Sequence, residues 1–120
     1  MNKKEVEQEQ LKLTKEIQQK ENKAHELNHE KKRVNETFDT FQLELRKGYR
    51  ELTRLNQEVI HFGGKETLAA QQQEDEEHLI IRRRLGILQE EIIQQYGNEA
   101  KLIELEKESL YKRRNELVWD

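Results

Sequence analysis

The 120-residue sequence contains no cysteine and no proline, and it is poor in apolar residues. The absence of cysteine excludes disulfide frameworks, thiolate zinc sites and cysteine nucleophiles. Hydrophobic residues make up 32% of the chain and charged residues 39%, whereas a globular domain has about 45% and 25%. One large hydrophobic core is therefore not expected, because too little buried surface would offset the entropy of ordering the chain. Composition alone allows either disorder or long helices.

Long apolar runs are absent as well. The longest, Leu79-Ile80-Ile81, is far too short to span a membrane. The N-terminal segment carries positive charge with no apolar stretch after it, so we expect no signal peptide. The 22 basic and 25 acidic residues give a net charge of -3, which provides no overall attraction to nucleic acid. We expect a cytoplasmic protein without membrane insertion or nucleic-acid binding, and any export would need a route without a cleaved leader.

Glycine is the residue that breaks the helical pattern. Gly63 and Gly64 are adjacent and lie close to the midpoint of the chain. Such a pair readily supplies the positive φ at which helices end. The pattern predicts an all-α fold, an antiparallel two-helix hairpin forming a long coiled coil. We expect one helical-hairpin domain over residues 1–120, with arm one near 3–61, the turn at Phe62 to Glu66, and arm two near 67–117.

The first arm carries apolar residues at a seven-residue repeat. A stripe held this long at a period of 3.5 residues is typical of a left-handed coiled-coil seam, so disorder is the weaker interpretation. The apolar positions of this predicted seam are Val6, Leu13, Ile17, Ala24, Leu27, Val34, Phe38, Phe41, Leu45, Leu52, Leu55, Val59 and Phe62.

The second arm is less regular and contains a four-four step at Ile92-Tyr96-Ala100, which is a stutter. If the arms fold back at the glycine pair, residue i faces roughly residue 127 minus i. Leu85 then lies near Phe41, and Leu110 lies near Ile17. A register slipped by one helical turn would match nearly as well.

Two features do not fit a simple hairpin. The polar stretch 71–78 would face the predicted seam residues Leu52, Leu55 and Val59. Arm two also has apolar residues off its main stripe, at Ile80, Ile81, Ile87, Ile93, Leu102 and Leu105. A two-helix hairpin buries one narrow stripe per helix. The seam residues opposite the polar stretch and the additional apolar residues of arm two would therefore both stay exposed in a monomer. A partner helix or a second copy would cover them; the alternative is looser packing with a frayed segment at 68–78.

One short motif suggests metal chemistry. His25-Glu26-Leu27-Asn28-His29 matches H-E-x-x-H, in which two His one helical turn apart bind zinc. A zinc hydrolase also needs a third ligand and a shielded cleft, for which a charged helical hairpin offers no basis. Clusters such as Arg82-Arg83-Arg84 are expected to be solvated helix flanks. We expect no catalytic residue, no metal site and no cofactor, and therefore no enzyme.

The aromatic residues divide between the seam and the chain ends. Phe38 and Phe41 are expected in the core, and Phe62 is expected to cap the hairpin end. Trp119 is a candidate anchor for a partner, because Trp is enriched at binding hot spots. A frayed C-terminus is an equally good interpretation of Trp119.

The Phe62-Gly63-Gly64 turn between two long helices resembles the WXG-type helical hairpins of type VII secretion, with Phe in place of the Trp. The Gln/Glu/Lys-rich, cysteine-free composition resembles more closely the LXG-associated α-helical proteins of Firmicutes, second type. Proteins of that family bind the helical N-terminal domain of an LXG toxin and help target it for secretion. No C-terminal F-x-x-x-D or Y-x-x-x-D/E signal is present, since Asn115 stands four residues after Tyr111, which fits an accessory partner.

This resemblance implies a non-enzymatic adaptor or targeting chaperone, which binds the toxin domain and, in addition, a second small helical protein. The alternative is a self-associating coiled-coil scaffold, a homodimeric four-helix bundle in which two copies of the chain bury the same exposed apolar residues against each other. The residues expected to form the partner interface are Leu52, Leu55, Ile80, Ile87, Ile93, Leu102, Leu105 and Trp119.

Overall fold

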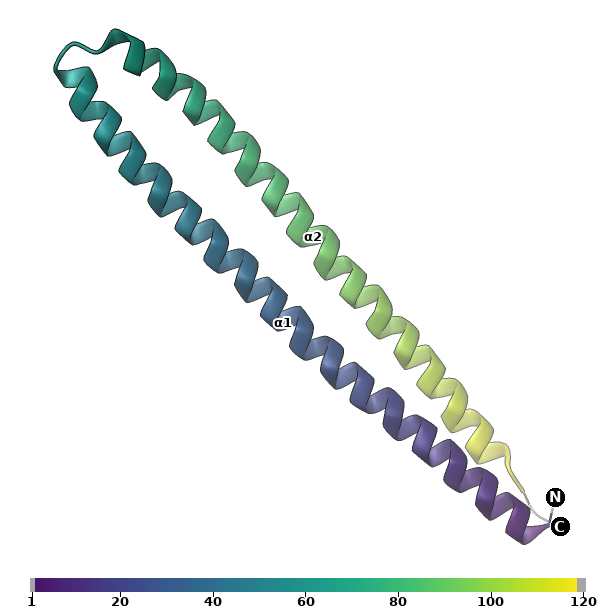
Figure 1. The fold of residues 1–120 in the computed structure, drawn as a ribbon. Coiled ribbons are helices and arrows are strands. Elements are labelled where there is room, and N and C mark those ends of the chain that lie inside the picture. The colour runs from purple at the N-terminus through teal and green to yellow at the C-terminus, as the bar shows by residue number, and fades with distance from the viewer. Residues whose placement is uncertain (1, 119–120) are drawn as a thin grey trace. The chain divides into compact units, whose positions relative to one another are not determined.

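The computed structural model describes residues 2–118 and consists there of two helices joined by a short turn (Figure 1). Helix α1 spans Lys3–His61 and helix α2 spans Lys65–Glu116. The predicted all-α antiparallel hairpin is confirmed, and its turn falls where the glycine pair was expected to place it. Helix α2 begins two residues before the predicted start of arm two, and the segment 68–78 is helical.

The N-terminus of α1 is closed by a reciprocal pair of hydrogen bonds. The Glu5 backbone N–H donates to Asn2 Oδ1 at 2.9 Å, and the Asn2 N–H lies 3.4 Å from Glu5 Oε2. This is a capping box, which satisfies two backbone donors that have no partner within the helix. The cap explains why α1 begins at Lys3.

The turn between the helices depends on both glycines. Gly63 has a φ of 98°, a left-handed conformation that costs a residue with a Cβ more than it costs glycine. The Gly64 N–H donates to the Val59 carbonyl at 3.2 Å, and the Gly63 N–H donates to the Ile60 carbonyl at 2.9 Å, which is the Schellman arrangement. A Cβ on Gly64 would lie 2.9 Å from Val59 Cγ1, so this position also requires the smallest residue.

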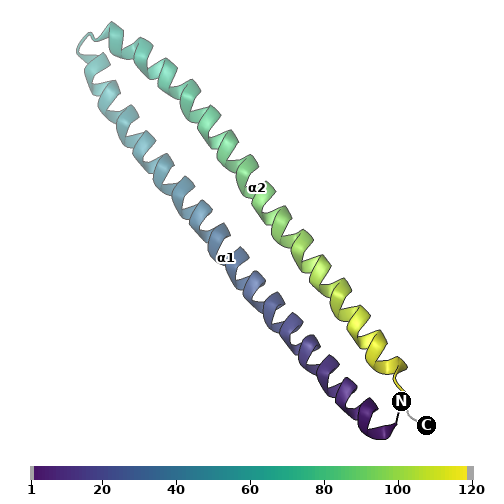
Figure 2. The ribbon, with the colours of Figure 1, turned by 45° about the vertical axis from the view of Figure 1, so that its right-hand side comes forward.

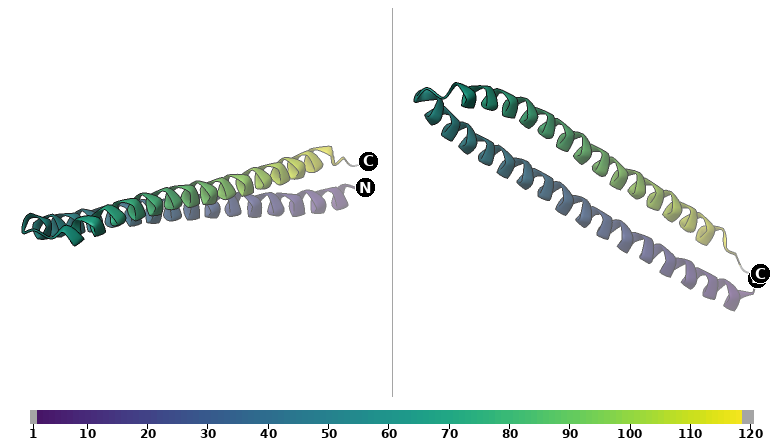
Figure 3. Two further views of the ribbon diagram at one scale, coloured as in Figure 1. Left: turned by 90° about the horizontal axis from the view of Figure 1, so that it is seen from above. Right: turned by 45° about the horizontal axis from the view of Figure 1, so that its top comes forward.

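The chain divides into two compact units. The terminal unit comprises residues 1–32 and 93–120, and the turn unit comprises residues 33–92. Within each unit the α1 and α2 segments lie side by side and run antiparallel, as the views from different directions agree (Figures 2 and 3).

The terminal unit contains the hydrophobic core of the described chain. Leu13, Ile17 and Leu110 form one buried cluster, against which Tyr111 and Leu117 pack. Val6 and Ile103 are also buried. The predicted seam is therefore confirmed here, and Leu110 packs with Ile17 as the register predicted.

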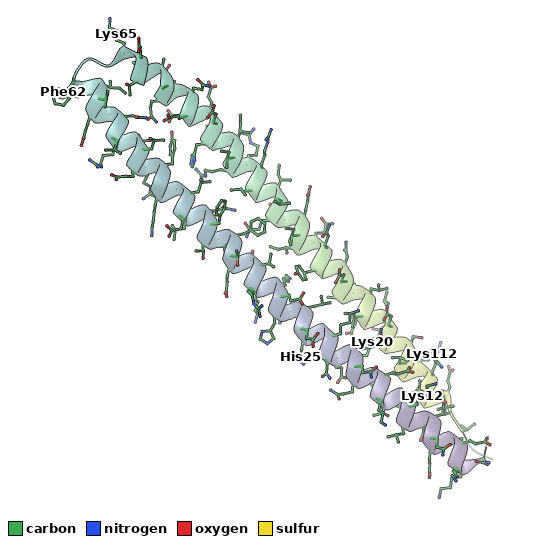
Figure 4. All side chains as sticks on the ribbon, in the orientation of Figure 1. Lys12, Lys20, His25, Phe62, Lys65 and Lys112 are labelled. Atoms are coloured by element: carbon green, nitrogen blue, oxygen red, sulfur yellow. The ribbon has the colours of Figure 1, made fainter. Side chains whose placement is uncertain are left out.

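Polar contacts hold the same register in the terminal unit. Lys20, on the side of α1 that faces α2, forms an ion pair with Glu106 (Figure 4). Tyr111 Oη donates to Glu21 Oε1 at 3.1 Å. The Lys20 hydrogen bond holds the pKa of Glu106 below its usual value, against the opposing effect of desolvation.

In the turn unit the seam differs from the prediction. Phe41, Leu52, Leu55 and Val59, all expected in the seam, are 54%, 42%, 46% and 50% exposed, so that expectation is wrong. Phe62 is 87% exposed and does not cap the hairpin end; its ring lies on the outer side of the turn (Figure 4). The α1 positions that contact α2 instead include Gln42, Thr53 and Asn56, each one residue after a predicted seam position, and Tyr49.

The change of seam is a stutter in α1. The inward stripe runs through Val34, Phe38 and Gln42 in two consecutive steps of four, where a heptad alternates four and three. The reason lies in α2, whose segment 71–78 is polar. Leucines packed against that segment would leave its buried hydrogen-bonding groups without partners, at a cost of about 1–3 kcal/mol for each group.

Candidate partner-binding surface

A hydrogen-bond network around Gln71 joins the two helices of the turn unit. Gln71 is 7% exposed, and its Nε2 lies 3.3 Å from Tyr49 Oη, 3.2 Å from Thr53 Oγ1 and 2.7 Å from Asp75 Oδ1. Its Oε1 accepts a hydrogen bond from Asn56 Nδ2 at 2.6 Å. The amide is fully satisfied, so this network specifies the pairing of α1 and α2 without an apolar core.

Gln89 forms a second polar contact layer in the turn unit. Its Oε1 accepts from Gln42 Nε2 at 2.9 Å, and its Nε2 donates to Asn35 Oδ1 at 2.6 Å and to Asp39 Oδ1 at 3.1 Å. Amide side chains thus join the two helices alongside the partly buried Val34 and Phe38. The exposed apolar residues of the turn unit lie outside this contact.

Tyr49 and His78 lie between these two layers. Their rings stack with centroids 3.9 Å apart and an interplanar angle of 4°. His78 is 9% exposed, and its burial, with a smaller contribution from the Arg82 charge, lowers the pKa of its imidazole, while Asp75 opposes the shift. The fold therefore favours a neutral His78.

We expect the turn unit to lose stability as the pH falls through the usual His pKa of 6.5. The folded-state pKa of His78 lies below that of the unfolded chain, so the unfolded chain binds more protons as the pH drops towards the folded pKa. The measurement is the thermal unfolding midpoint by circular dichroism at pH 7.5 and 5.5. His78→Phe keeps a ring on Tyr49 without the titration, so its midpoint should fall less over this interval. Equal falls in both proteins would refute the assignment.

Two grooves of the turn unit flank the Tyr49–His78 stack. The first, here the acidic groove, has a volume of about 350 Å³ and contains no Lys or Arg in its lining. Beside the stack, its lining residues are Leu45, Gly48, Leu52, Ile81, Glu44, Glu74 and Glu77. The second, here the basic groove, has a volume of about 580 Å³ and is lined beside the stack by Leu79, Asp75, Arg46, Arg50 and Arg82. The two grooves differ in charge and in apolar content.

The acidic groove is part of a longer apolar surface on α1. We call it the apolar stripe: Phe41, Leu45, Leu52, Leu55 and Val59, which recur at spacings that place them on one side of a helix. Except for the partly buried Leu45, each is at least 42% exposed. Ile81, 46% exposed, adds an α2 side chain to this surface, because it lines the same groove as Leu52.

Within the turn unit, the residues predicted for the partner interface lie on two different surfaces. Leu52 lines the acidic groove and Leu55 follows it along the apolar stripe. Ile80 and Ile87 are 47% and 50% exposed and lie seven residues apart on a different side of α2, since Ile80 is about 100° around the helix from Ile81.

The other predicted interface residues lie elsewhere. Ile93, Leu102 and Leu105 belong to the terminal unit, where Ile93 is partly buried and the two leucines are exposed. Leu105 lines a groove there with Lys20 and Glu106. Trp119 lies outside the described residues.

Sequence reasoning missed three members of the exposed surface. Phe41 and Val59 were assigned to the seam, and Ile81 was counted as surplus but not as interface. The signal that could have revealed them is the polar stretch 71–78. Because its buried polar side chains need hydrogen-bond partners on α1, polar residues of α1 occupy the contact and the apolar residues lie outside it.

The H-E-x-x-H motif gains no support from its surroundings. His25 and His29 are both exposed on α1. Over residues 2–118, no group of three or more His, Asp or Glu side chains is arranged to hold a metal ion. Neither helix, over the same residues, has a stretch both apolar and long enough to cross a membrane.

Comparisons of the chain with protein-family models, with curated proteins and with solved structures give no match. The interpretation of the surface therefore depends on the chain's own geometry and chemistry.

Proposed function

We propose that the protein is a non-enzymatic helical adaptor, whose turn unit binds an amphipathic helix of a partner along the apolar stripe. The partner proposed is the helical N-terminal domain of an LXG toxin, which the adaptor would help target for type VII secretion. The observation that carries the proposal is that Phe41, Leu52, Leu55 and Val59 remain exposed although the turn unit already has its own inter-helix contacts.

The energetics of the turn unit favour such a role. Its helices are joined by a satisfied polar network, so covering the apolar stripe would not compete with contacts inside the hairpin. Each stripe side chain that a partner covers fully contributes about 1.5–3 kcal/mol in gross transfer terms. Only part of that sum appears as affinity, because association also costs translational freedom and side-chain order.

Co-expression of the full chain with the N-terminal domain of an LXG toxin tests the proposal. We expect the two proteins to co-purify, and light scattering to give the mass of one complex rather than of two separate proteins. A tight homodimer that fails to bind the toxin domain would instead establish the scaffold, a homodimeric four-helix bundle. A monomer that fails to bind would refute both functions.

A further inference from the structure

The charges around the acidic groove restrict what can occupy the apolar stripe. Three carboxylates, from Glu44, Glu74 and Glu77, surround Leu52 and Ile81, and no Lys or Arg lines this groove. Across the stack, the basic groove presents three guanidinium groups and one carboxylate. The basic and acidic residues of the whole chain nearly balance, at a net charge of -3. The separation of carboxylates from guanidinium groups is therefore a local feature of these two grooves.

The carboxylates of the acidic groove are poorly neutralised by their own chain. Glu44 forms an ion pair with Lys47 at 3.8 Å. Glu74 accepts a hydrogen bond from Asn56 at 2.9 Å, and Glu77 accepts one from Gln73 at 3.2 Å. Neither of these two carboxylates is in an ion pair within residues 2–118. A cationic group on a partner would therefore find acceptors already in place.

We propose that the acidic groove and apolar stripe bind a helix that carries an apolar stripe flanked by Lys or Arg. This inference rests on the adaptor function and specifies the partner's chemistry. The apolar side chains would pack on Leu52 and Ile81, and the flanking cations would lie over Glu44, Glu74 and Glu77. Charge complementarity of this kind selects the partner and speeds association more than it adds affinity.

A second copy of the chain is the wrong occupant for this surface. Pairing the same surfaces across a two-fold axis places the acidic grooves of both copies in one interface. That interface would contain the three carboxylates of each copy, with no Lys or Arg in either lining to compensate. Like charges placed opposite each other at an interface are destabilising, so the arrangement disfavours self-association through the apolar stripe.

The length of the stripe gives the length of the partner helix. From Phe41 to Val59 the α1 backbone advances about 27 Å, at about 1.5 Å per residue. A bound helix of about 18–20 residues covers this distance.

Two synthetic helical peptides of matched length test the inference. Both carry leucine at the a and d positions of a heptad; one carries lysine and the other glutamate at the flanking e and g positions. We expect the full chain to bind the lysine peptide at least about tenfold more tightly, with the preference shrinking in high salt. The measurement is fluorescence anisotropy at two salt concentrations. Equal affinities, or binding of neither peptide, would overturn the inference.

Charge reversal locates the preference on the protein. Glu44→Lys together with Glu77→Lys changes two exposed residues and should reverse the choice, so that the glutamate peptide binds more tightly. The matched control is Arg46→Glu with Arg50→Glu in the basic groove, which should leave the order unchanged. If the wild type instead prefers the glutamate peptide and the Arg46 and Arg50 variant reverses that preference, the occupant binds the basic groove and the inference fails.

The toxin domain separates this inference from the proposed function. If the lysine peptide is preferred but the toxin domain does not bind, the groove chemistry stands and the adaptor function fails. If the toxin domain binds but neither competes with the lysine peptide nor responds to the reversal at Glu44 and Glu77, the adaptor function stands and the inference fails.

Discussion

Leu13→Ala should lower the free energy of unfolding by about 2–4 kcal/mol, the largest stability effect we expect from one substitution. Leu13 is 2% exposed and packs with Ile17 and Leu110 at the centre of the terminal unit. Alanine would leave a cavity in a contact with few other apolar side chains to close it. The measurement is urea unfolding followed by circular dichroism at 222 nm.

Leu11→Ala is the matched control for Leu13→Ala. Leu11 stands two residues earlier on the same helix and is 58% exposed. Its truncation removes the same atoms from a solvated position and should change the free energy of unfolding by less than about 0.5 kcal/mol. Similar effects at the two positions would show that Leu13 is not in the core.

Leu52→Asp should weaken partner binding by about 30-fold or more, the loss typical of a binding hot spot. The substitution removes an apolar contact and adds a fourth carboxylate to the acidic groove. Leu52 is 42% exposed, so the helix content of the free protein should stay near that of the wild type. Titration calorimetry with the toxin domain proposed as the partner measures the change.

Ile80→Asp provides the corresponding control on α2. Ile80 is 47% exposed, and the same change of chemistry there lies outside the lining of the acidic groove. Its affinity for the partner should remain within about twofold of the wild type, because contacts outside the buried centre contribute little. A larger loss for Ile80→Asp than for Leu52→Asp would move the interface to the outer side of α2.

The helices and their turn could be predicted because their causes are local. The heptad repeat predicted a long first helix, and the glycine pair predicted where it stops. The observed boundary at His61 agrees with that expectation. The register near 127 is also confirmed, for Asn56 bonds to Gln71 and Tyr49 stacks on His78.

The side of α1 that faces α2 in the turn unit could not be predicted from apolar spacing. Counting hydrophobic residues placed Leu52 and Leu55 inside, whereas Thr53 and Asn56 occupy the contact. The difference is one residue, or about 100° around the helix. It arises because Gln71 forms hydrogen bonds with residues of α1. The spacing of apolar residues within α1 gives no indication of these bonds.

The sequence by itself determined an all-α hairpin, its turn and the hydrophobic pairing of the terminal unit, because helix periodicity and glycine geometry are properties of neighbouring residues. Only the tertiary structure decided which apolar residues remain exposed together. Leu52 and Ile81 line one groove although they belong to different helices, while Ile80 faces away from it. That choice depends on hydrogen bonds between the helices, because a buried polar group left without a partner costs about 1–3 kcal/mol.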